Sequence, residues 1–201
     1  MTVEENPRFH TLGVFCGSAD HLDRSYYDSA RVMGELLAKN EITLVYGGGR
    51  TGMMGAVARG VLDSGGVVIG VVPRGLESPQ LVFTAAEITH LELVENIQIR
   101  KARMNELSEG FIALPGGFGT MDELFEVLTW SQIGLHRKPV GLLNVNGYYD
   151  DLINWIQRSY EDHFIYQEHL DLFVVDPTPE GLLEKLILHR FPADLSHWLE
   201  R

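Results

Sequence analysis

Residues 115–123 read Pro-Gly-Gly-Phe-Gly-Thr-Met-Asp-Glu and lie between an apolar run, Gly110 to Leu114, and a helical pattern that begins at about Thr120. The glycines at 116, 117 and 119 leave room for backbone N–H groups to approach an anion, and the N-terminus of the following helix favours negative charge. The segment therefore predicts a strand, a phosphate-binding turn and a helix. The alternative is that the glycines only allow a tight turn between strand and helix.

The rest of the chain repeats this order of a short apolar run, a turn and a longer helical pattern, which is typical of βαβ units. Several runs are apolar on both faces, as central parallel strands are. We expect strands at Thr11 to Cys16, Ile42 to Tyr46, Val67 to Val72, Ile88 to Val94, Gly110 to Leu114, Pro139 to Leu143 and Leu172 to Val175. We expect helices at about Arg24 to Lys39, Gly52 to Ser64, Glu95 to Ser108, Thr120 to Gly134, Tyr148 to Phe164 and Thr178 to Arg190.

This pattern predicts a single Rossmann-like, doubly wound α/β domain over residues 1–201, with a mostly parallel central sheet and helices on both faces. No low-complexity linker or repeat divides the chain. Residues 1–9 and 192–201 are expected to be flexible tails. In folds of this kind, ligands bind at the carboxyl ends of the strands, near the point where the strand order reverses.

Two more glycine-rich turns follow the first and second predicted strands and would meet the third at that edge of the sheet. No G-x-G-x-x-G pattern follows the first strand, and about 20 residues past Gly47, where a ribose-binding acid would be expected, the chain has Val67 and Val68. The chain also has no Walker sequence, so a mononucleotide is favoured over a dinucleotide or a nucleoside triphosphate. The residues expected to bind the phosphate or the nucleotide are Gly17, Ser18, Gly47, Gly48, Lys101, Gly116, Gly117, Gly119 and Thr120.

Arg100 interrupts an apolar helical face, since it projects within the arc defined by Ile97, Met104 and Leu107. One interpretation is a cation directed into the ligand cleft, with Lys101 close by to raise the local positive potential. The other is a structural ion pair, or a side chain that buries its stem and keeps its charge in water.

Glu123 also has two interpretations. Thr120-Met-Asp-Glu123 fits a capping box, in which both residues only stabilise the start of the helix. Alternatively, the Glu123 carboxylate faces bound ribose, because it lies just beyond the phosphate-binding turn. The same helix is apolar around most of its circumference, which favours burial on two sides and predicts a homodimer.

Composition narrows the class of protein. The chain has 201 residues with 16 Lys+Arg and 28 Asp+Glu, a formal net charge of −12 that argues against nucleic-acid binding. Its longest uncharged stretch, Gly110 to Met121, is shorter than a membrane span. The single cysteine, Cys16, and scattered histidines give no expectation of a metal site. We expect a cytoplasmic protein without membrane or nucleic-acid partners.

Arg100-Lys-Ala-Arg-Met, followed by residues 115–123, resembles the LOG (Lonely guy) family of cytokinin riboside 5′-monophosphate phosphoribohydrolases, long mislabelled as lysine decarboxylases. The segments Val45-Tyr-Gly-Gly-Gly and Lys138-Pro-Val-Gly-Leu-Leu-Asn-Val-Asn-Gly-Tyr-Tyr-Asp also look like family segments, in the right order. The resemblance covers nearly the whole chain, and its specific motif is P-G-G-x-G-T-x-x-E.

The resemblance implies hydrolysis of the N-glycosidic bond of an adenosine 5′-monophosphate, often N6-prenylated, to free base and ribose 5-phosphate, without a cofactor. By position, it makes Arg100 the catalytic arginine and places Glu123 at the ribose. It also implies that the 5′-phosphate binds at Gly116, Gly117, Gly119 and Thr120. The chain departs from the family at Ile97-Gln98-Ile99, where Met-His is common before the residue preceding Arg-Lys, so the base preference stays open.

Three alternatives are weighed against this function. A nucleosidase acting on AMP or on purine nucleotides broadly would need the same residues, and so would a non-catalytic carrier of a nucleotide or cofactor. A decarboxylase would need pyridoxal phosphate bound to a lysine, and we reject it because no lysine has a convincing setting. The lysines are Lys39, Lys101, Lys138 and Lys185.

Overall fold

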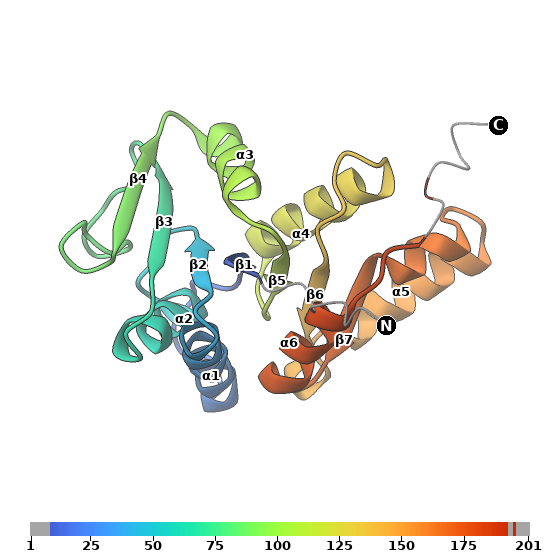
Figure 1. The fold of residues 1–201 in the computed structure, drawn as a ribbon, viewed down its shortest axis with the longest axis horizontal. Coiled ribbons are helices and arrows are strands. Elements are labelled where there is room, and N and C mark those ends of the chain that lie inside the picture. The colour runs from blue at the N-terminus through green and yellow to red at the C-terminus, as the bar shows by residue number, and fades with distance from the viewer. Residues whose placement is uncertain (1–8, 193–194, 196–201) are drawn as a thin grey trace, which may run out of the picture.

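The computed structural model describes residues 9–192 and 195, which form a seven-stranded sheet covered by helices (Figure 1). All neighbouring strands are parallel, in the order β4-β3-β2-β1-β5-β6-β7, as Figure 1 shows from left to right. The strands are β1 (Thr11–Phe15), β2 (Thr43–Tyr46), β3 (Val68–Pro73), β4 (His90–Val94), β5 (Phe111–Ala113), β6 (Val140–Leu143) and β7 (Phe173–Asp176).

The strand order reverses between β1 and β5. The chain first builds outward from β1 through β2, β3 and β4, and then returns to the other side of β1 with β5. In register, Gly13 of β1 pairs with Val45 of β2 on one side and with Phe111 of β5 on the other. The loops that leave the carboxyl ends of β1 and β5 therefore diverge to opposite faces and leave a crevice between them.

The helices form two layers, because alternate strand residues face opposite sides of the sheet. Leu44 and Tyr46 of β2 belong to one hydrophobic cluster, together with residues of α1, α2 and α6, whereas Val45 belongs to a second cluster with residues of α3, α4 and α5. The helices are α1 (Arg24–Lys39), α2 (Gly52–Asp63), α3 (Ile97–Leu107), α4 (Phe118–Gln132), α5 (Asp150–Glu161) and α6 (Pro179–Leu188), with 3-10 helices η1 (Val145–Gly147) and η2 (Gln167–Leu172).

Helices α1 and α2 approach each other at two glycines. A Cβ on Gly34 of α1 would overlap the carbonyl oxygen of Val57, and a Cβ on Gly60 of α2 would overlap the carbonyl oxygen of Arg31. The missing side chains let the two backbones come into direct contact. The two helices, and the loops that precede them, are consequently held as one unit.

The predicted fold class is confirmed, and the predicted elements are all present, α1 with the predicted bounds and the others with shifted ends. The shift that bears on function is in α4, which begins at Phe118 and not at Thr120. In the described residues, no helix has both the length and the hydrophobicity needed to cross a membrane. Most of the predicted tails, residues 1–8, 193–194 and 196–201, lie outside the described residues, while Phe9 and Leu195 are buried.

Candidate functional site

A cavity of about 480 Å³ lies at the carboxyl ends of β1, β2 and β5, at the reversal of strand order. The loops after these three strands provide most of its surface, and α3 and α4 provide its charged groups. The lining residues are Val14, Cys16, Gly17, Ser18, Ala19, Gly47, Met54, Arg100, Gly117, Phe118, Gly119, Thr120 and Glu123. The structure thus brings together most of the residues that the sequence singled out, from four separate segments of the chain.

Arg100 and Glu123 form an ion pair inside this cavity. Arg100 Nη1 donates to Glu123 Oε1 at 2.7 Å, and the two side chains are 13% and 10% exposed. Arg100 Nε also donates to the carbonyl oxygen of Val71 at 3.1 Å. These two bonds use different nitrogens of the guanidinium and fix its orientation in the cavity, so the arginine is neither a free surface cation nor remote from the cleft.

Burial and charge act in opposite directions on the Glu123 carboxyl. Desolvation by burial raises its pKa above the ordinary value of 4.5, and the neighbouring Arg100 lowers it. The raised pKa reflects the larger effect of burial. Cys16, on the same cavity, has its thiol pKa raised, mainly by burial and also by the negative charge of Glu123, so its sulfur is a neutral thiol near neutral pH. The cavity therefore contains one paired carboxylate and no thiolate nucleophile.

The capping-box interpretation of Thr120 and Glu123 is wrong. The N-cap of α4 is Gly117, which has no side chain to cap the helix, so Thr120 lies within the first turn and not before it. Glu123 reaches across to Arg100 instead of back to the helix start. Because the helix begins at Phe118, the backbone N–H groups of its first turn belong to the glycine-rich segment itself.

The loop before α4 is fixed from several directions. The Gly17 N–H donates to the carbonyl oxygen of Pro115 at 3.0 Å, which ties the loops after β1 and β5 together. A Cβ on Gly116 would overlap Thr120 Oγ1 and lie 2.7 Å from the Gly17 nitrogen, so only glycine fits there. Gly116 is consequently a packing residue of the loop, while Gly117 and Gly119 face the cavity.

Gly47 makes room for the arginine. A Cβ at this position would overlap Arg100 Nη2 and lie 2.8 Å from Met54 Cε. Its neighbour Gly48 has φ +77°, and a side chain there would overlap Val72. Gly48 therefore serves the turn, and its own atoms are not part of the cavity surface.

Like Gly48 and Gly116, Lys101 is a predicted binding residue that does not line the cavity. Its Nζ lies 3.0 Å from Asp122 Oδ2 and 2.7 Å from Glu126 Oε2, so its charge is already balanced on the outer side of α4. The chain's four lysines all lie in the described residues, and none lines the cavity. A cofactor bound there through a lysine imine would have no lysine to bind.

Sequence reasoning missed the part played by Tyr148. Tyr148 is only the first residue of an expected helix in the sequence analysis, but its Oη donates to the carbonyl oxygen of Gly116 at 2.6 Å. Phe118 was also given no role, although it lines the cavity and is 97% exposed. The signal for Tyr148 was its place after β6, since the carboxyl ends of all parallel strands lie at one edge of the sheet.

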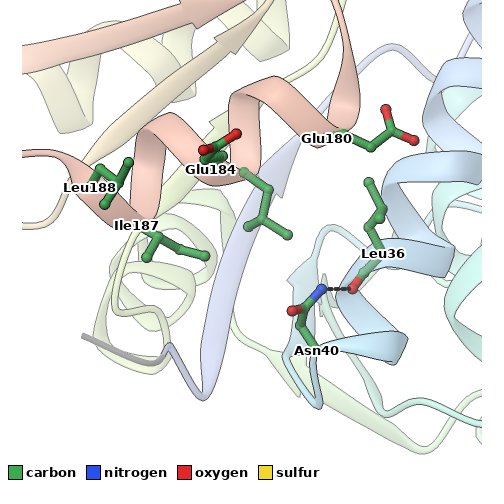
Figure 2. A pocket seen from close by; sticks show the side chains of 7 residues that line it. Leu36, Asn40, Glu180, Glu184, Ile187 and Leu188 are labelled. Carbon is green, nitrogen blue, oxygen red and sulfur yellow. Dashed lines mark hydrogen bonds between the residues drawn. The ribbon is translucent and has the colours of Figure 1, made fainter. Parts of the chain in front are cut away.

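A second cavity, of about 350 Å³, lies between α1 and α6, with lining residues Leu36, Asn40, Glu180, Leu183, Glu184, Ile187 and Leu188. Figure 2 shows Glu180 and Glu184 on α6, with Asn40 donating to the carbonyl oxygen of Leu36 at 2.8 Å. Its charged lining residues are both carboxylates, so it repels an anionic ligand. Elsewhere in the described residues, no group of three His, Cys, Asp or Glu side chains could hold a metal ion.

The fold and the site together define a Rossmann-like α/β protein with a glycine-lined cavity that holds a buried arginine–glutamate pair. The family model described as "Possible lysine decarboxylase" matches residues 54–186. A rice (Oryza sativa subsp. japonica) protein named "Probable cytokinin riboside 5'-monophosphate phosphoribohydrolase" is 45% identical over 179 residues, 89% of this chain and 71% of that protein. An Arabidopsis thaliana cytokinin riboside 5′-monophosphate phosphoribohydrolase is 43% identical over 182 residues, 90% of this chain and 84% of that protein. The chain belongs to this family, the LOG family of phosphoribohydrolases.

Two solved structures share the fold at lower sequence identity. A molybdenum cofactor binding protein from Rippkaea orientalis has a TM-score of 0.66 and 21% identity, covering 88% of this chain and 94% of its own. The molybdenum cofactor carrier protein of Chlamydomonas reinhardtii has a TM-score of 0.65 and 21% identity, covering 91% of this chain and 100% of its own. These likenesses establish the architecture.

Proposed function

We propose that this protein hydrolyses the N-glycosidic bond of adenosine 5′-monophosphates, including N6-prenylated ones, and releases free base and ribose 5-phosphate. The observation that carries the proposal is the Arg100–Glu123 pair, which lies in the same cavity as the glycine-rich N-terminus of α4. The relatives named as phosphoribohydrolases support it, since they share more than two fifths of their residues with this chain over most of its length.

The phosphate would bind at the start of α4. Gly117, Gly119 and Thr120 line the cavity there, and backbone N–H groups of a first helical turn have no partner within the helix. A chain with a net charge of −12 repels anions in general, so a phosphorylated ligand needs such a local site. Ser18 and Gly17 would complete the site from the loop after β1.

Glu123 would act on the sugar. As the base departs, positive charge develops at C1′, and a nearby carboxylate stabilises that charge. The hydroxyl group of a water molecule then bonds to C1′ as the bond between C1′ and the base breaks. The departing base gains one proton, and the water loses one, so the protons balance. Glu123 would also orient this water. Arg100 lowers the pKa of the Glu123 carboxyl, against the effect of burial, and so favours the ionised form that the reaction needs.

The base would occupy the apolar part of the cavity, where Val14, Met54 and Phe118 lie. Ile97 and Ile99, the two apolar residues in the segment that departs from the family pattern, are each 42% exposed, and neither lines this cavity. The departure at residues 97–99 therefore gives no reason to exclude unmodified AMP. A broad purine nucleotide nucleosidase is the competing activity, and substrate comparison separates the two.

We also propose a homodimer and a cytoplasmic location. Several aromatic and aliphatic side chains on or beside α4 and α5 are exposed, which leaves apolar surface for a second copy to cover. They are Phe118, Leu135, Trp155 and Phe164. A single buried cysteine, Cys16, fits a reducing compartment.

The direct test is to incubate the purified protein, without metal or cofactor, with AMP and separately with N6-isopentenyladenosine 5′-monophosphate, and to measure free base by chromatography. A higher kcat/KM for the prenylated nucleotide supports cytokinin activation, and equal values indicate a broader nucleosidase. Glu123→Gln is the matched inactive control. Binding of both nucleotides with no release of base contradicts hydrolysis and indicates a carrier.

A further inference from the structure

Three consecutive carbonyl groups of the glycine-rich loop are held by partners from other loops. Tyr149 Oη donates to the Leu114 carbonyl at 2.7 Å, and the Gly17 N–H donates to the Pro115 carbonyl at 3.0 Å. Tyr148 Oη donates to the Gly116 carbonyl at 2.6 Å. Tyr149 is buried, with 1% exposure, whereas Tyr148 is 44% exposed. Only the last of these anchors therefore depends on a side chain that can be changed without opening the core.

The Gly116 carbonyl determines where the next N–H group points. Across a trans peptide bond the carbonyl and the N–H lie in one plane and point in opposite directions, and none of the described peptide bonds is cis. A carbonyl of Gly116 fixed on Tyr148 thus fixes the N–H of Gly117 in the opposite direction. Gly117 is the N-cap of α4 and lines the cavity. Without the anchor, this peptide could rotate, since glycine on both sides imposes little restriction.

Tyr148 is itself held in place independently of any ligand. It lies between η1 and α5, where Asn144 Oδ1 accepts from the Tyr149 N–H at 2.7 Å and Asn144 Nδ2 donates to Asp150 Oδ1 at 2.7 Å. The Tyr148 ring packs edge-on against Tyr26, with centroids 6.1 Å apart, and against Tyr149, with centroids 5.2 Å apart. These contacts place the hydroxyl before a ligand arrives.

We propose that Tyr148 is a positioning residue for the phosphate site. It orients the Gly116–Gly117 peptide so that the Gly117 N–H donates to the phosphoryl oxygens of the ligand. Tyr148 does not line the cavity and so acts through the loop, not by contact with the substrate. The inference rests on the proposed function only for the identity of the ligand, since the geometry serves any phosphate monoester.

The test compares Tyr148→Phe with Tyr160→Phe. The second variant also removes a tyrosine hydroxyl, but from a residue of α5 that has no bond to the glycine-rich loop in the structure. Binding of ribose 5-phosphate, of inorganic phosphate and of adenine is measured by calorimetry, and KM and kcat are measured with AMP. Tyr148→Phe is expected to weaken both phosphate ligands about 3- to 10-fold, the effect of losing one hydrogen bond, and to raise KM by a similar factor. Adenine affinity and kcat should change by less than about twofold, and Tyr160→Phe should match the wild type.

Unchanged phosphate affinity in Tyr148→Phe overturns the inference, and so does an equal loss for adenine, which would mean that the whole cavity had been disturbed. A wild-type protein that binds neither phosphate ligand overturns it as well. The proposed hydrolysis can fail separately. If no nucleotide releases base but Tyr148→Phe still weakens ribose 5-phosphate, the positioning role stands and only the reaction is wrong.

Discussion

Arg100 of α3 and Glu123 of α4 lie 23 positions apart in the chain, and their side chains meet at 2.7 Å in the cavity at the reversal of strand order. The pair combines the two interpretations that the sequence left open for Arg100, since the arginine is in an ion pair and is also directed into the cleft. Each residue balances the charge of the other, because removing either one would leave a buried, uncompensated charge.

Glu123→Gln should abolish most activity while the protein stays folded. Glutamine has nearly the same size and its amide oxygen can still accept from Arg100, but it carries no charge to stabilise the sugar cation. We expect kcat to fall at least about 100-fold, as when one electrostatic group of an active site is lost. Base release and thermal melting measure the two effects. Asp122→Asn, which alters the adjacent exposed acid, is the control, and full activity in Glu123→Gln would refute the assignment.

The acid limb of the pH profile should reflect the raised pKa of Glu123. A carboxyl whose folded-state pKa is raised takes up its proton at a higher pH, so the reactive carboxylate is lost as the pH falls through a value above 4.5. Arg100→Met should move the Glu123 pKa higher still, because it removes the cation that lowers it. Carbon-13 NMR titration of the Glu123 carboxyl in both proteins measures this directly. A pKa that is lower in Arg100→Met would contradict the electrostatic coupling.

Gly47→Ala should inactivate the protein by moving Arg100. The added methyl would overlap Arg100 Nη2, so we expect the guanidinium to shift and kcat/KM to fall at least about 10-fold. The control is a double-mutant cycle with Arg100→Met. In that background the alanine should cause almost no further loss, because the group that it displaces is already gone. Independent, multiplying losses would show that Gly47 acts by another route.

Two glycines of the segment 115–123 should respond to alanine in opposite ways. Gly116→Ala would overlap Thr120 Oγ1, so we expect a loss of about 1–3 kcal/mol of folding stability from overpacking. A Cβ on Gly119 would meet no protein atom within 4 Å, and alanine in a helix is about 0.5–1 kcal/mol better than glycine, so Gly119→Ala should melt at the same or a higher temperature. Its methyl would nevertheless narrow the phosphate site. Thermal melts and ribose 5-phosphate titrations test both, and undiminished binding by Gly119→Ala would argue against phosphate at this turn.

The homodimer gives a further prediction. Sedimentation should find a species of twice the 22.6 kDa chain mass, and Trp155→Glu should shift it toward the single-chain mass by placing a charge on the exposed apolar surface of α5. Trp155→Phe preserves an apolar ring and should stay dimeric. A wild-type protein that sediments at 22.6 kDa at micromolar concentration would contradict the proposal.

The sequence was sufficient for the fold class because local signals agree along the chain. Apolar β-branched runs such as Val68–Pro73 need burial on both faces, and the glycine turns mark where each strand ends. The strand order was not predictable from such signals, since the pairing of β1 with both β2 and β5 joins residues up to 98 positions apart. Only the general rule for parallel sheets placed the three turns at one edge.

The site was predictable where a residue type is unusual for its position in the sequence pattern, as with Arg100 among the apolar residues Ile97, Met104 and Leu107. The role of a residue was not predictable where it depends on which other residue of the chain its side chain contacts. Lys101 has a plausible place in the sequence, yet two acids of the next helix hold its charge. Tyr148 acts through a carbonyl 32 positions away, and a hydroxyl-to-carbonyl bond has no sequence pattern. The start of α4 was misplaced because Thr120 imitates a cap.

The close approach of α1 and α2 at Gly34 and Gly60 has a consequence for how a ligand reaches the cavity. The loop before α1 is also bonded to the start of α2, because Thr51 Oγ1 donates to the Ser18 carbonyl at 2.7 Å and the Met54 N–H donates to the Gly17 carbonyl at 3.2 Å. The side of the cavity formed by the loop before α1 and the start of α2 can open only if the contact between these two helices is lost. We therefore expect opening motions on the opposite side of the cavity, where Met104 is the one fully buried residue of α3. Amide hydrogen exchange should be faster in α3 than in α1 or α2. Because α3 carries Arg100, an opening on this side would move the arginine away from Glu123.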